Sequence, residues 1–239
     1  MEQPEAKKAK KPKKKSKKRV RAHVNVFSPR AEAPPPDPAS VAWETVFAGW
    51  KAGQGRQVTV LDVGCGFGGL LEHLSPLHPD KFVLGLEIRD SVAEAVRERI
   101  AKLRAQNPAY GNLGVLNMNA MKHMPNYFRR AQLEAMFFLY ADPHFQKSKH
   151  KRRIITLDLC DTYAYLLQPG GRLYTATDVE DLHNSQVEAL AAHPCFERVS
   201  DAECEKDPNV PVMLSATDEA AKAKREGRGQ WYSVFQRKR

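Results

Sequence analysis

The sequence predicts an α/β domain built on a doubly wound, mostly parallel sheet with helices on both faces. Short apolar segments of strand length alternate with amphipathic segments of helix length, which is the pattern of parallel strands joined by helices. A glycine-rich turn directly follows the first strand-like segment, as it does where such a sheet binds a ligand. The chain has 239 residues, enough to enclose a core of this kind.

The first half of the predicted domain contains three strands and two long helices. In the second helix, Val92, Val96, Ile100 and Leu103 recur at helical spacing with Arg and Glu on the other face, which predicts a helix over Ser91–Gln106. The other predicted elements of this half are an amphipathic turn or short helix at VAWETVFAGW (41–50), a strand, glycine turn and helix at QVTVLDVGCGFGGLLEHL (57–74), and strands at KFVLGLEIR (81–89) and LGVLNMNAM (113–121).

The second half continues the alternation of strands and helices. Pro169 and Gly170 end a predicted helix, because proline and glycine both disfavour helix continuation. The predicted elements are a strand at LEAMFFLYADP (133–143), this helix at Ile154–Gly171, a strand at RLYTATD (172–178), a helix at VEDLHNSQVEALAAH (179–193) and a final alternating strand at Gln230–Lys238.

Positive charge is concentrated before the domain. The formal charge of the chain is +10, yet residues 1–21 hold eleven Lys/Arg and two Glu, so the remaining residues are close to neutral. We expect residues 1–21 to be a disordered basic tail, residues 22–40 a Pro-rich connector and residues 41–239 the domain. The tail fits a nuclear import signal, a nucleic-acid-binding arm or a solubilising extension. If the tail is an import signal, the protein is located in the nucleus, which is the location we expect.

The composition disfavours a membrane protein, a secreted protein and a cysteine-bound metal site. The sequence has no apolar run long enough to span a membrane and no apolar stretch of a signal peptide at its N-terminus. The four cysteines are scattered without the paired spacing of a metal site, which predicts reduced thiols and no bound metal.

The glycine turn and the next strand predict a site for an adenosine cofactor. LDVGCGFGG matches G-x-G-x-x-G through Gly64, Gly66 and Gly69, and Glu87 ends the second strand where an acid can accept hydrogen bonds from ribose hydroxyls. Glu87 has the alternative role of capping the following helix. Asp62 would repel a pyrophosphate but tolerate a sulfonium. This favours S-adenosylmethionine over NAD, as does the polar NMNAM segment, which could read an adenine edge.

The fourth strand ends at a carboxylate that is followed by a basic cluster. Asp142 lies at the carboxyl end of that strand, where doubly wound sheets bind ligands. Exposed aromatic Phe145 and a run of cations follow it, which fits a nucleic-acid strand with phosphates on the cations and a base near the ring. The alternative is a charged surface that contacts only water. The basic and histidine residues of the run are His144, Lys147, Lys149, His150, Lys151, Arg152 and Arg153.

Methyl transfer to N7 of guanine would explain a lone carboxylate at this place. N7 already carries a lone pair, so no general base is required. A carboxylate can instead accept hydrogen bonds from N1–H and the exocyclic amine of guanine, and it favours the positive charge that the purine acquires. Asp142 would then hold the base, which leaves its stack, while the cations hold the backbone.

Several segments together resemble the catalytic subunit of the eukaryotic tRNA (guanine-N7)-methyltransferases, which are Rossmann-like class I enzymes dependent on S-adenosylmethionine. The resemblance extends from about Arg21 to the C-terminus and implies methylation of the variable-loop guanosine at tRNA position 46. It also implies a WD-repeat partner that supports the tRNA. The segments are LDVGCGFGGLLEHLSPLHPD, LGLEIRDSV, NAMKHMPNYF, MFFLYADPHFQKSKHKRRII and ATDEAAK.

The resemblance assigns roles to individual residues. It implies that Asp142 is catalytic and that a helix over about Pro143–Lys151 engages tRNA. His144, Lys147, Lys151, Arg152 and Arg153 are the residues we expect to bind the substrate. The residues it implies for S-adenosylmethionine are Gly64, Glu87, Arg89, Asn119, Ala120, Leu139, Thr217 and Glu219.

Three positions depart from the family pattern. Ala141 replaces the usual proline before the Asp-Pro pair, which should loosen the backbone there. Val24 stands where animal members carry a serine, so no phosphorylation is expected at that position. Ala220 replaces a glycine after the Thr-x-Glu triplet, a minor change at the start of a helix.

Two other functions fit parts of the same sequence. An NAD-linked oxidoreductase would share the fold, and NAD binding without S-adenosylmethionine binding would favour it. An RNA-binding subunit that has lost turnover would share the basic cluster, although the presence of Glu87 and Asp142 argues against it.

Overall fold

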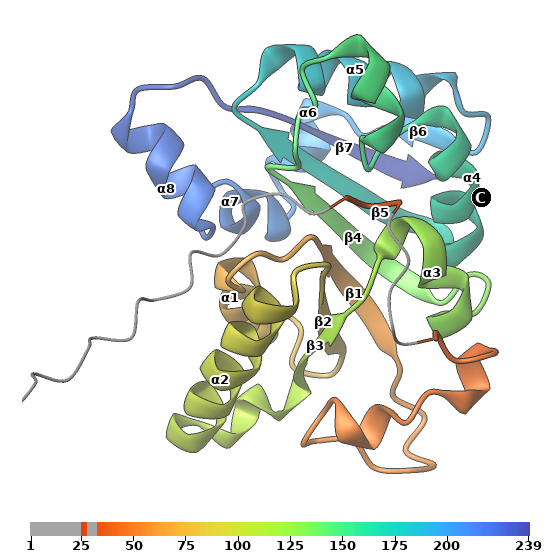
Figure 1. The fold of residues 1–239 in the computed structure, drawn as a ribbon, viewed down its shortest axis with the longest axis vertical. Helices are drawn as coiled ribbons and strands as arrows, with labels where there is room; N and C mark the ends of the chain where they lie inside the picture. The colour runs from red at the N-terminus through yellow and green to blue at the C-terminus, as the bar shows by residue number, and fades with distance from the viewer. Residues whose placement is uncertain (1–24, 28–32) are drawn as a thin grey trace, which may run out of the picture.

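The computed structural model describes residues 25–27 and 33–239. The strands are β1 (Val58–Val63), β2 (Phe82–Glu87), β3 (Leu113–Asn117), β4 (Leu133–Leu139), β5 (Leu167–Thr177), β6 (Phe196–Arg198) and β7 (Trp231–Arg237). They form a seven-stranded sheet in the order β3-β2-β1-β4-β5-β7-β6 (Figure 1). Pairing is parallel from β3 through β5, and β7 is antiparallel to both β5 and β6. The predicted doubly wound, mostly parallel sheet is therefore confirmed, and its strand order reverses between β1 and β4.

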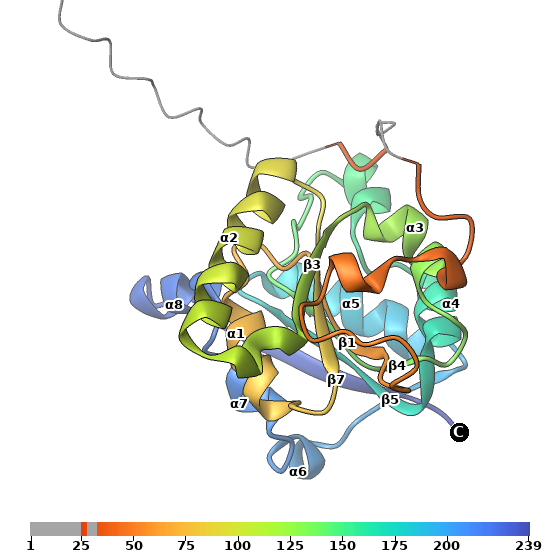
Figure 2. The same cartoon turned by 90° about the horizontal axis from the view of Figure 1, so that it is seen from below.

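Helices cover both faces of the sheet, as predicted. The helices are α1 (Gly69–Leu77), α2 (Asp90–Gln106), α3 (Ala120–Tyr127), α4 (Leu157–Leu166), α5 (Glu180–Ala192), α6 (Asp201–Cys204), α7 (Asn209–Met213) and α8 (Asp218–Arg225). Apolar side chains of α3, α4 and α5 pack into one buried cluster on one face, and those of α1, α2 and α7 into a second cluster on the other. Figure 2 shows α1 and α2 on one side of the strands and α3 and α4 on the other.

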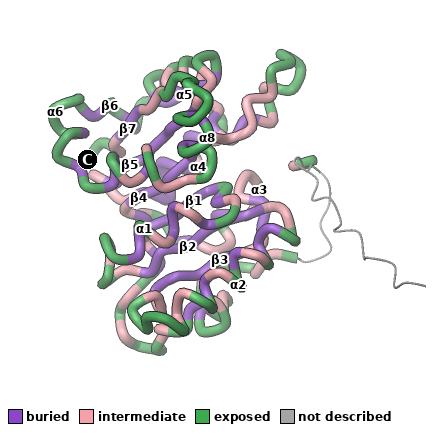
Figure 3. The backbone as a smooth tube through the Cα atoms, turned by 90° about the vertical axis from the view of Figure 1, so that its left-hand side faces the viewer, coloured by how far each residue is buried: buried purple, intermediate pink, exposed green. Residues whose placement is uncertain are grey.

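The central strands form because their residues are apolar on both faces. All six residues of β2 are buried, and β1 is buried at every position but Thr59. Helices on both sides leave no face of these strands in contact with water, so an unbroken apolar run is stable there. Figure 3 shows this as a buried central layer between more exposed helices. Gly85 in β2 is required for close packing, because a Cβ there would lie 2.7 Å from Sγ of Cys65.

The predicted helix over Ile154–Gly171 is shorter than expected. Helix α4 ends at Leu166, and β5 begins at Leu167, which pairs with Leu133 of β4. Pro169 and Gly170 therefore lie within the irregular start of a strand and do not end the helix. The prediction was wrong here because the pairing partner of Leu167 is far away in the sequence.

Other boundaries also differ from the predictions. The third predicted strand, 113–121, ends at Asn117, and Ala120 begins α3. The sequence pattern did not indicate β6, α6 or α7, which are three to five residues long. The helix over Ser91–Gln106 and the final strand are confirmed within a residue, as α2 and β7.

The segment before the sheet packs on the domain through aromatic rings. A 3-10 helix, η2 (Trp43–Thr45), lies in VAWETVFAGW, and Trp43 stacks on Phe128 with ring centroids 6.0 Å apart. Phe47 packs on Phe82 of β2 at 4.6 Å. Part of the predicted connector is also in contact with the domain, since Asn126 donates to the backbone oxygen of Pro35. The basic tail and Val24 lie outside the described residues.

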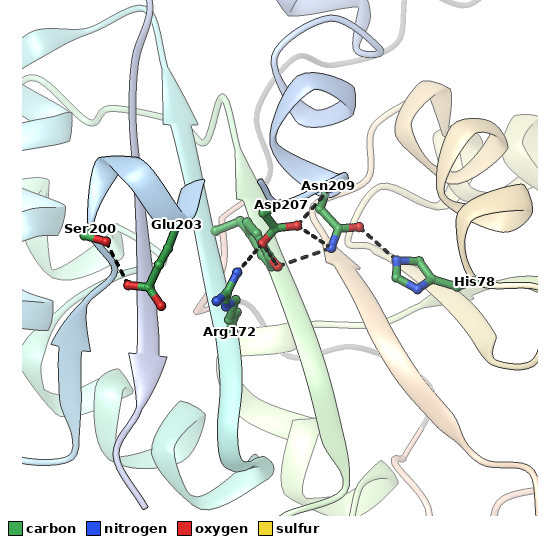
Figure 4. A network of polar contacts seen from close by, with 7 residues as sticks. His78, Arg172, Ser200, Glu203, Asp207 and Asn209 are labelled. Carbon is green, nitrogen blue, oxygen red and sulfur yellow. Dashed lines mark hydrogen bonds and ion pairs between the residues drawn. The ribbon is translucent and has the colours of Figure 1, made fainter. Parts of the chain in front are cut away.

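A polar network joins α1, β5 and α7 at the end of the sheet opposite the strand carboxyl ends (Figure 4). Asp207 accepts hydrogen bonds from Arg172 at 2.7 Å and from the hydroxyl of Tyr174 at 2.8 Å. Asn209 donates to Asp207 from its backbone at 2.9 Å, and its side-chain oxygen lies 2.8 Å from Nε2 of His78. Burial raises the pKa of Asp207, but these hydrogen bonds outweigh it, and the pKa lies below its usual value.

Candidate active site

The glycine turn after β1 leaves open space at the carboxyl edge of the sheet. Gly64 and Gly66 have φ of 80° and 53°, and the backbone N–H groups of Gly64 and Cys65 both donate to the carbonyl of Leu86. A Cβ at Gly64 or Gly66 would meet no atom within 4 Å, so these glycines leave room for a ligand. Gly69 instead allows close packing against a distant segment, because a Cβ there would lie 2.6 Å from the carbonyl oxygen of Ala216.

Glu87 and Arg89 form a fixed pair beside this turn. The buried Glu87 carboxylate accepts from the backbone N–H of Gly66 at 3.1 Å and of Arg89 at 2.8 Å. Arg89 also donates to it from Nε and Nη2, at 3.1 and 3.0 Å. The hydrogen bond to Glu87 raises the pKa of Arg89. The carboxylate therefore fixes the turn and the arginine together, and its hydrogen bond from the N–H of Arg89, the N-cap residue of α2, also holds the start of that helix.

Asn119 and Ala120 begin α3 at the next strand. The Asn119 side chain caps the helix by accepting from the N–H of Met121 at 3.1 Å. Its Nδ2 donates to the carbonyl of Val26 at 2.5 Å. This contact holds residues 25–27 against the same edge of the sheet. Val26 lines a pocket of about 740 Å³ there. No sequence pattern placed Val26 there, because the contact spans 93 residues.

The chain turns sharply where β4 ends. Leu139 is the last residue of the strand, and Tyr140 and His144 have left-handed φ of 50° and 45°. Between them, the Asp142 side chain is 34% exposed, and its Oδ1 accepts from the backbone N–H of His144 at 3.2 Å. Nδ1 of His144 lies 3.7 Å from the same oxygen. Left-handed backbone is uncommon outside glycine, so two such residues around one carboxylate indicate a constrained loop.

A pocket of about 740 Å³ brings most of the predicted site residues together. Asp142 also lines an adjoining pocket of about 450 Å³, so it stands where two pockets meet. The predicted residues that line the larger pocket are Gly64, Glu87, Arg89, Asn119, Ala120, Leu139, Asp142, His144, Arg152 and Glu219. Thr217, Lys147, Lys151 and Arg153 do not line it.

Thr217 and Glu219 belong to the start of α8. Thr217 is the N-cap of the helix, and its hydroxyl accepts from the N–H of Ala220 at 3.0 Å. Glu219, the second residue of the helix, lines the pocket. Ala220 is buried in this first turn.

The basic residues after Asp142 have different environments. Lys147, Lys149 and Lys151 are exposed, and they lie on a 3-10 helix, η4 (Lys147–Arg152). The predicted helix over Pro143–Lys151 is therefore wrong in its first four residues, which are not helical. Arg153 is only 3% exposed, and it donates to the carbonyl of Pro143 at 2.9 Å and to Asp181 at 2.7 Å.

Carboxylates cluster beneath the glycine turn. Asp62 in β1 is 3% exposed, and its pKa is raised to about 8, first by burial and then by the negative charges of Glu219 and Glu87. Burial also raises the pKa of the neighbouring Cys65 thiol. This edge of the sheet disfavours further negative charge and favours a cation.

The pocket has further polar lining residues that sequence reasoning missed. Arg228 pairs with Asp178, and its Nε lies 2.9 Å from Glu226. Tyr140 and Lys222 also line the pocket. Tyr140 could have been found from its place two residues before Asp142, whereas Arg228 comes from the loop after α8 and has no local signal. Among the described residues, there is no group of three or more His, Cys, Asp or Glu side chains able to hold a metal.

Comparison with known proteins identifies the family. A family model described as a putative methyltransferase matches residues 56–233. A tRNA (guanine-N(7)-)-methyltransferase of Brugia malayi is 49% identical over 92% of this chain and 84% of its own length. The protein of the same name from Yarrowia lipolytica is 47% identical over 92% of this chain and 76% of its own length. The chain belongs to this family.

The assignment to this family rests on relatives whose sequences align with 92% of the chain. A solved structure of the 16S rRNA methyltransferase KamB is similar at a TM-score of 0.49 and 17% identity, over 77% of this chain and 89% of that one. Within the described part of this methyltransferase, no helix is both long and apolar enough to cross a bilayer.

Proposed function

We propose that this chain transfers a methyl group from S-adenosylmethionine to N7 of a guanosine in tRNA. The observation that carries the proposal is one pocket lined by both Glu87 and Asp142, from β2 and from the turn after β4. The relatives are named for tRNA (guanine-N7) methylation. The family model described as a putative methyltransferase spans both segments. The finer proposal is that the guanosine is the one at position 46 in the variable loop.

The residues at the sheet edge fit S-adenosylmethionine. Gly64 leaves open space beside the pocket, and Glu87 and Arg89 provide a fixed acid and cation at its wall. The carboxyl groups of Asp62, Glu87 and Glu219 suit a ligand with positive charge, whereas they would repel the pyrophosphate of NAD. When bound, S-adenosylmethionine supplies an electrophilic methyl group.

Asp142 is suited to hold the guanine. Its carboxylate stands at the junction of the two pockets and is partly exposed, so an entering base can reach it. We propose that it accepts hydrogen bonds from the base edge that carries N1–H and the amine. Phe145, 74% exposed beside it, offers an aromatic face on which a base can stack. No residue needs to remove a proton from N7.

Cations that follow Asp142 in the chain suit the tRNA backbone. Lys147 and Lys151 are exposed on η4, and half-buried Arg152 on the same 3-10 helix lines both pockets with Asp142, so we propose that they hold phosphates while the base enters the pocket. Arg153 is buried, and we propose that it supports the loop after Asp142 through the Pro143 carbonyl. We further propose a WD-repeat partner, a nuclear location, and import or tRNA binding by the tail, all of which rest on the family resemblance and on residues 1–21.

The test is a methylation assay followed by analysis of the product. The full chain is incubated with labelled S-adenosylmethionine and bulk tRNA, with and without a WD-repeat partner, and the tRNA is digested to nucleosides. We expect label in N7-methylguanosine. Label in another nucleoside would contradict the proposed target atom, and NAD binding by calorimetry without S-adenosylmethionine binding would contradict the reaction.

A further inference from the structure

We propose that Tyr140 is a positioning residue, held by Gln230, that sets the orientation of the Asp142 carboxylate. This inference rests on the proposed function, because it concerns the residue that we assign to guanine. Tyr140 lies directly between the last residue of β4 and the Ala-Asp-Pro turn, and it lines the same pocket as Asp142.

The backbone of Tyr140 is the point at which the chain leaves the sheet. Its N–H donates to the carbonyl of Ala176 in β5 at 2.7 Å, and its φ of 50° then redirects the chain. A residue before a proline is restricted to extended backbone. Ala141, which stands where the family pattern has proline, therefore permits the left-handed conformation of Tyr140. Pro143 imposes the corresponding restriction on Asp142 from the other side.

The side chain of Tyr140 is fixed from a distant part of the sequence. Nε2 of Gln230 donates to the Tyr140 hydroxyl at 2.5 Å and to the carbonyl of Leu214 at 3.0 Å. One amide group thereby joins the end of β4 to the segment that precedes α8. The bond to Leu214 fixes the Gln230 amide in place, and the fixed amide then holds the Tyr140 hydroxyl more firmly than a water molecule would.

The Leu214 segment is itself held against the glycine turn. The carbonyl of Ala216 lies so near Gly69 that a Cβ there would be 2.6 Å away, and Thr217 then caps α8, which carries Glu219. The Tyr140–Gln230 contact therefore connects Asp142 with the side of the pocket that holds Glu219. Burial raises the pKa of the Tyr140 hydroxyl, so the group stays neutral and can accept the amide hydrogen bond near pH 7.

This arrangement replaces the restraint that a proline at position 141 would give. Without the phenol contact, the backbone bond to Ala176 and the apolar packing of the ring would still hold Tyr140, but the hydroxyl end of the side chain would lose its restraint. The Asp142 carboxylate would then sample more orientations, and fewer of them would suit the guanine edge. Methyl transfer should slow, while binding of the cofactor and of tRNA elsewhere on the surface should not change.

A double-mutant cycle tests this role. Tyr140→Phe removes the hydroxyl, Gln230→Leu removes the amide, and the two are combined; Tyr165→Phe, on the exposed side of α4, is the matched control. We expect kcat to fall about tenfold in each single variant and no further in the double variant, because each substitution removes the hydrogen bond between Gln230 and the Tyr140 hydroxyl. The dissociation constant for S-adenosylmethionine and the KM for tRNA should stay within about twofold of wild type.

Hydrogen exchange of residues 140–146 gives a second measurement that does not depend on activity. Both single variants should exchange faster there than the wild type and Tyr165→Phe. Unchanged kcat and unchanged exchange would overturn the proposal, as would losses that add in the double variant. Weaker binding of S-adenosylmethionine in proportion to the loss of kcat would also overturn it and place Tyr140 in cofactor binding. A wild-type chain that makes no N7-methylguanosine would contradict the proposed function, whereas the exchange data would still test the contact itself.

Discussion

Two buried aspartates at opposite ends of the sheet have opposite environments. Asp207 receives hydrogen bonds from Arg172, Tyr174 and Asn209, and its pKa is lowered. Asp62 lies beneath the glycine turn near Glu87 and Glu219, and its pKa is raised to about 8. The first carboxylate is stabilised by the protein alone. The second is destabilised by the protein alone, as expected where a cationic ligand supplies the missing charge.

The difference separates residues that support the fold from residues that prepare a site. The network at Asp207 joins α1, β5 and α7 and should matter for stability. The carboxylates at the strand carboxyl ends, including Asp142, should matter for ligand binding and turnover. Substitutions at the two ends of the sheet should therefore have different measurable consequences.

The largest effect is expected for Asp142→Ala. Loss of the group that orients the guanine should lower kcat by about 10²–10³-fold, with the melting temperature and the S-adenosylmethionine dissociation constant close to wild type. Steady-state kinetics with tRNA, calorimetry and thermal melting measure the three quantities. Glu188→Ala, an exposed acid on α5, is the control. Wild-type turnover in the Asp142 variant would remove this residue from the mechanism.

Asp207→Ala should have the reverse pattern. Removing the carboxylate leaves Arg172 and the Tyr174 hydroxyl without their shared acceptor, which should cost about 3 kcal/mol of unfolding free energy. For a domain of this size, that is a fall in melting temperature of about 6–12 °C. The kcat of the folded fraction, measured well below the melting temperature, should stay near wild type. A stable variant with impaired turnover would show that the network serves the site.

Charge reversal on η4 should have a smaller effect, confined to tRNA binding. Lys147→Glu with Lys151→Glu should weaken tRNA binding about tenfold and reduce the slope of log K against log salt by about 1–2, because fewer counterions are released. Lys102→Glu on α2 is the matched exposed control. Filter binding at several salt concentrations gives the slope. An unchanged slope would mean that these lysines contact no phosphates.

Asp62→Asn should have an effect on stability that is visible as a change with pH. The folded-state pKa of about 8 lies above the unfolded value of 3.8, so the stability that Asp62 contributes is present below pH 3.8 and is lost as the pH rises toward 8. The melting temperature of Asp62→Asn relative to wild type should therefore rise between pH 5 and pH 8, by about 2–4 °C for each kcal/mol. Asp207 has a lowered pKa, so stability due to it should instead be lost as the pH falls below its usual value.

If the melting temperatures of the wild type and of Asp62→Asn change in parallel from pH 5 to pH 8, Asp62 does not titrate in that range. Binding of S-adenosylmethionine offers a second measurement of the same group. Because a bound cation favours the ionised carboxylate, affinity for the wild type should rise with pH more steeply than affinity for Asp62→Asn.

The sequence indicated the site well where its residues follow strands directly. Gly64, Glu87, Asn119 and Asp142 each stand at or just after the end of a parallel strand, and such ends meet at one edge of the sheet. Their convergence in one pocket follows from the alternation of strands and helices. The same reasoning could not distinguish Lys147 from Arg153, since a run of cations does not show which side chains turn inward.

Local pattern by itself determined every described strand except β6, the long helices, the glycine turn and the order in which they are joined. It did so because apolar periodicity and glycine placement act over a few residues. The tertiary structure alone decided that β5 begins at Leu167, that Arg153 is buried, and that Gln230 reaches Tyr140 across 90 residues. These features depend on which distant segments pack together. The free energy of such a contact depends on both partners, so neither segment's own sequence predicts it.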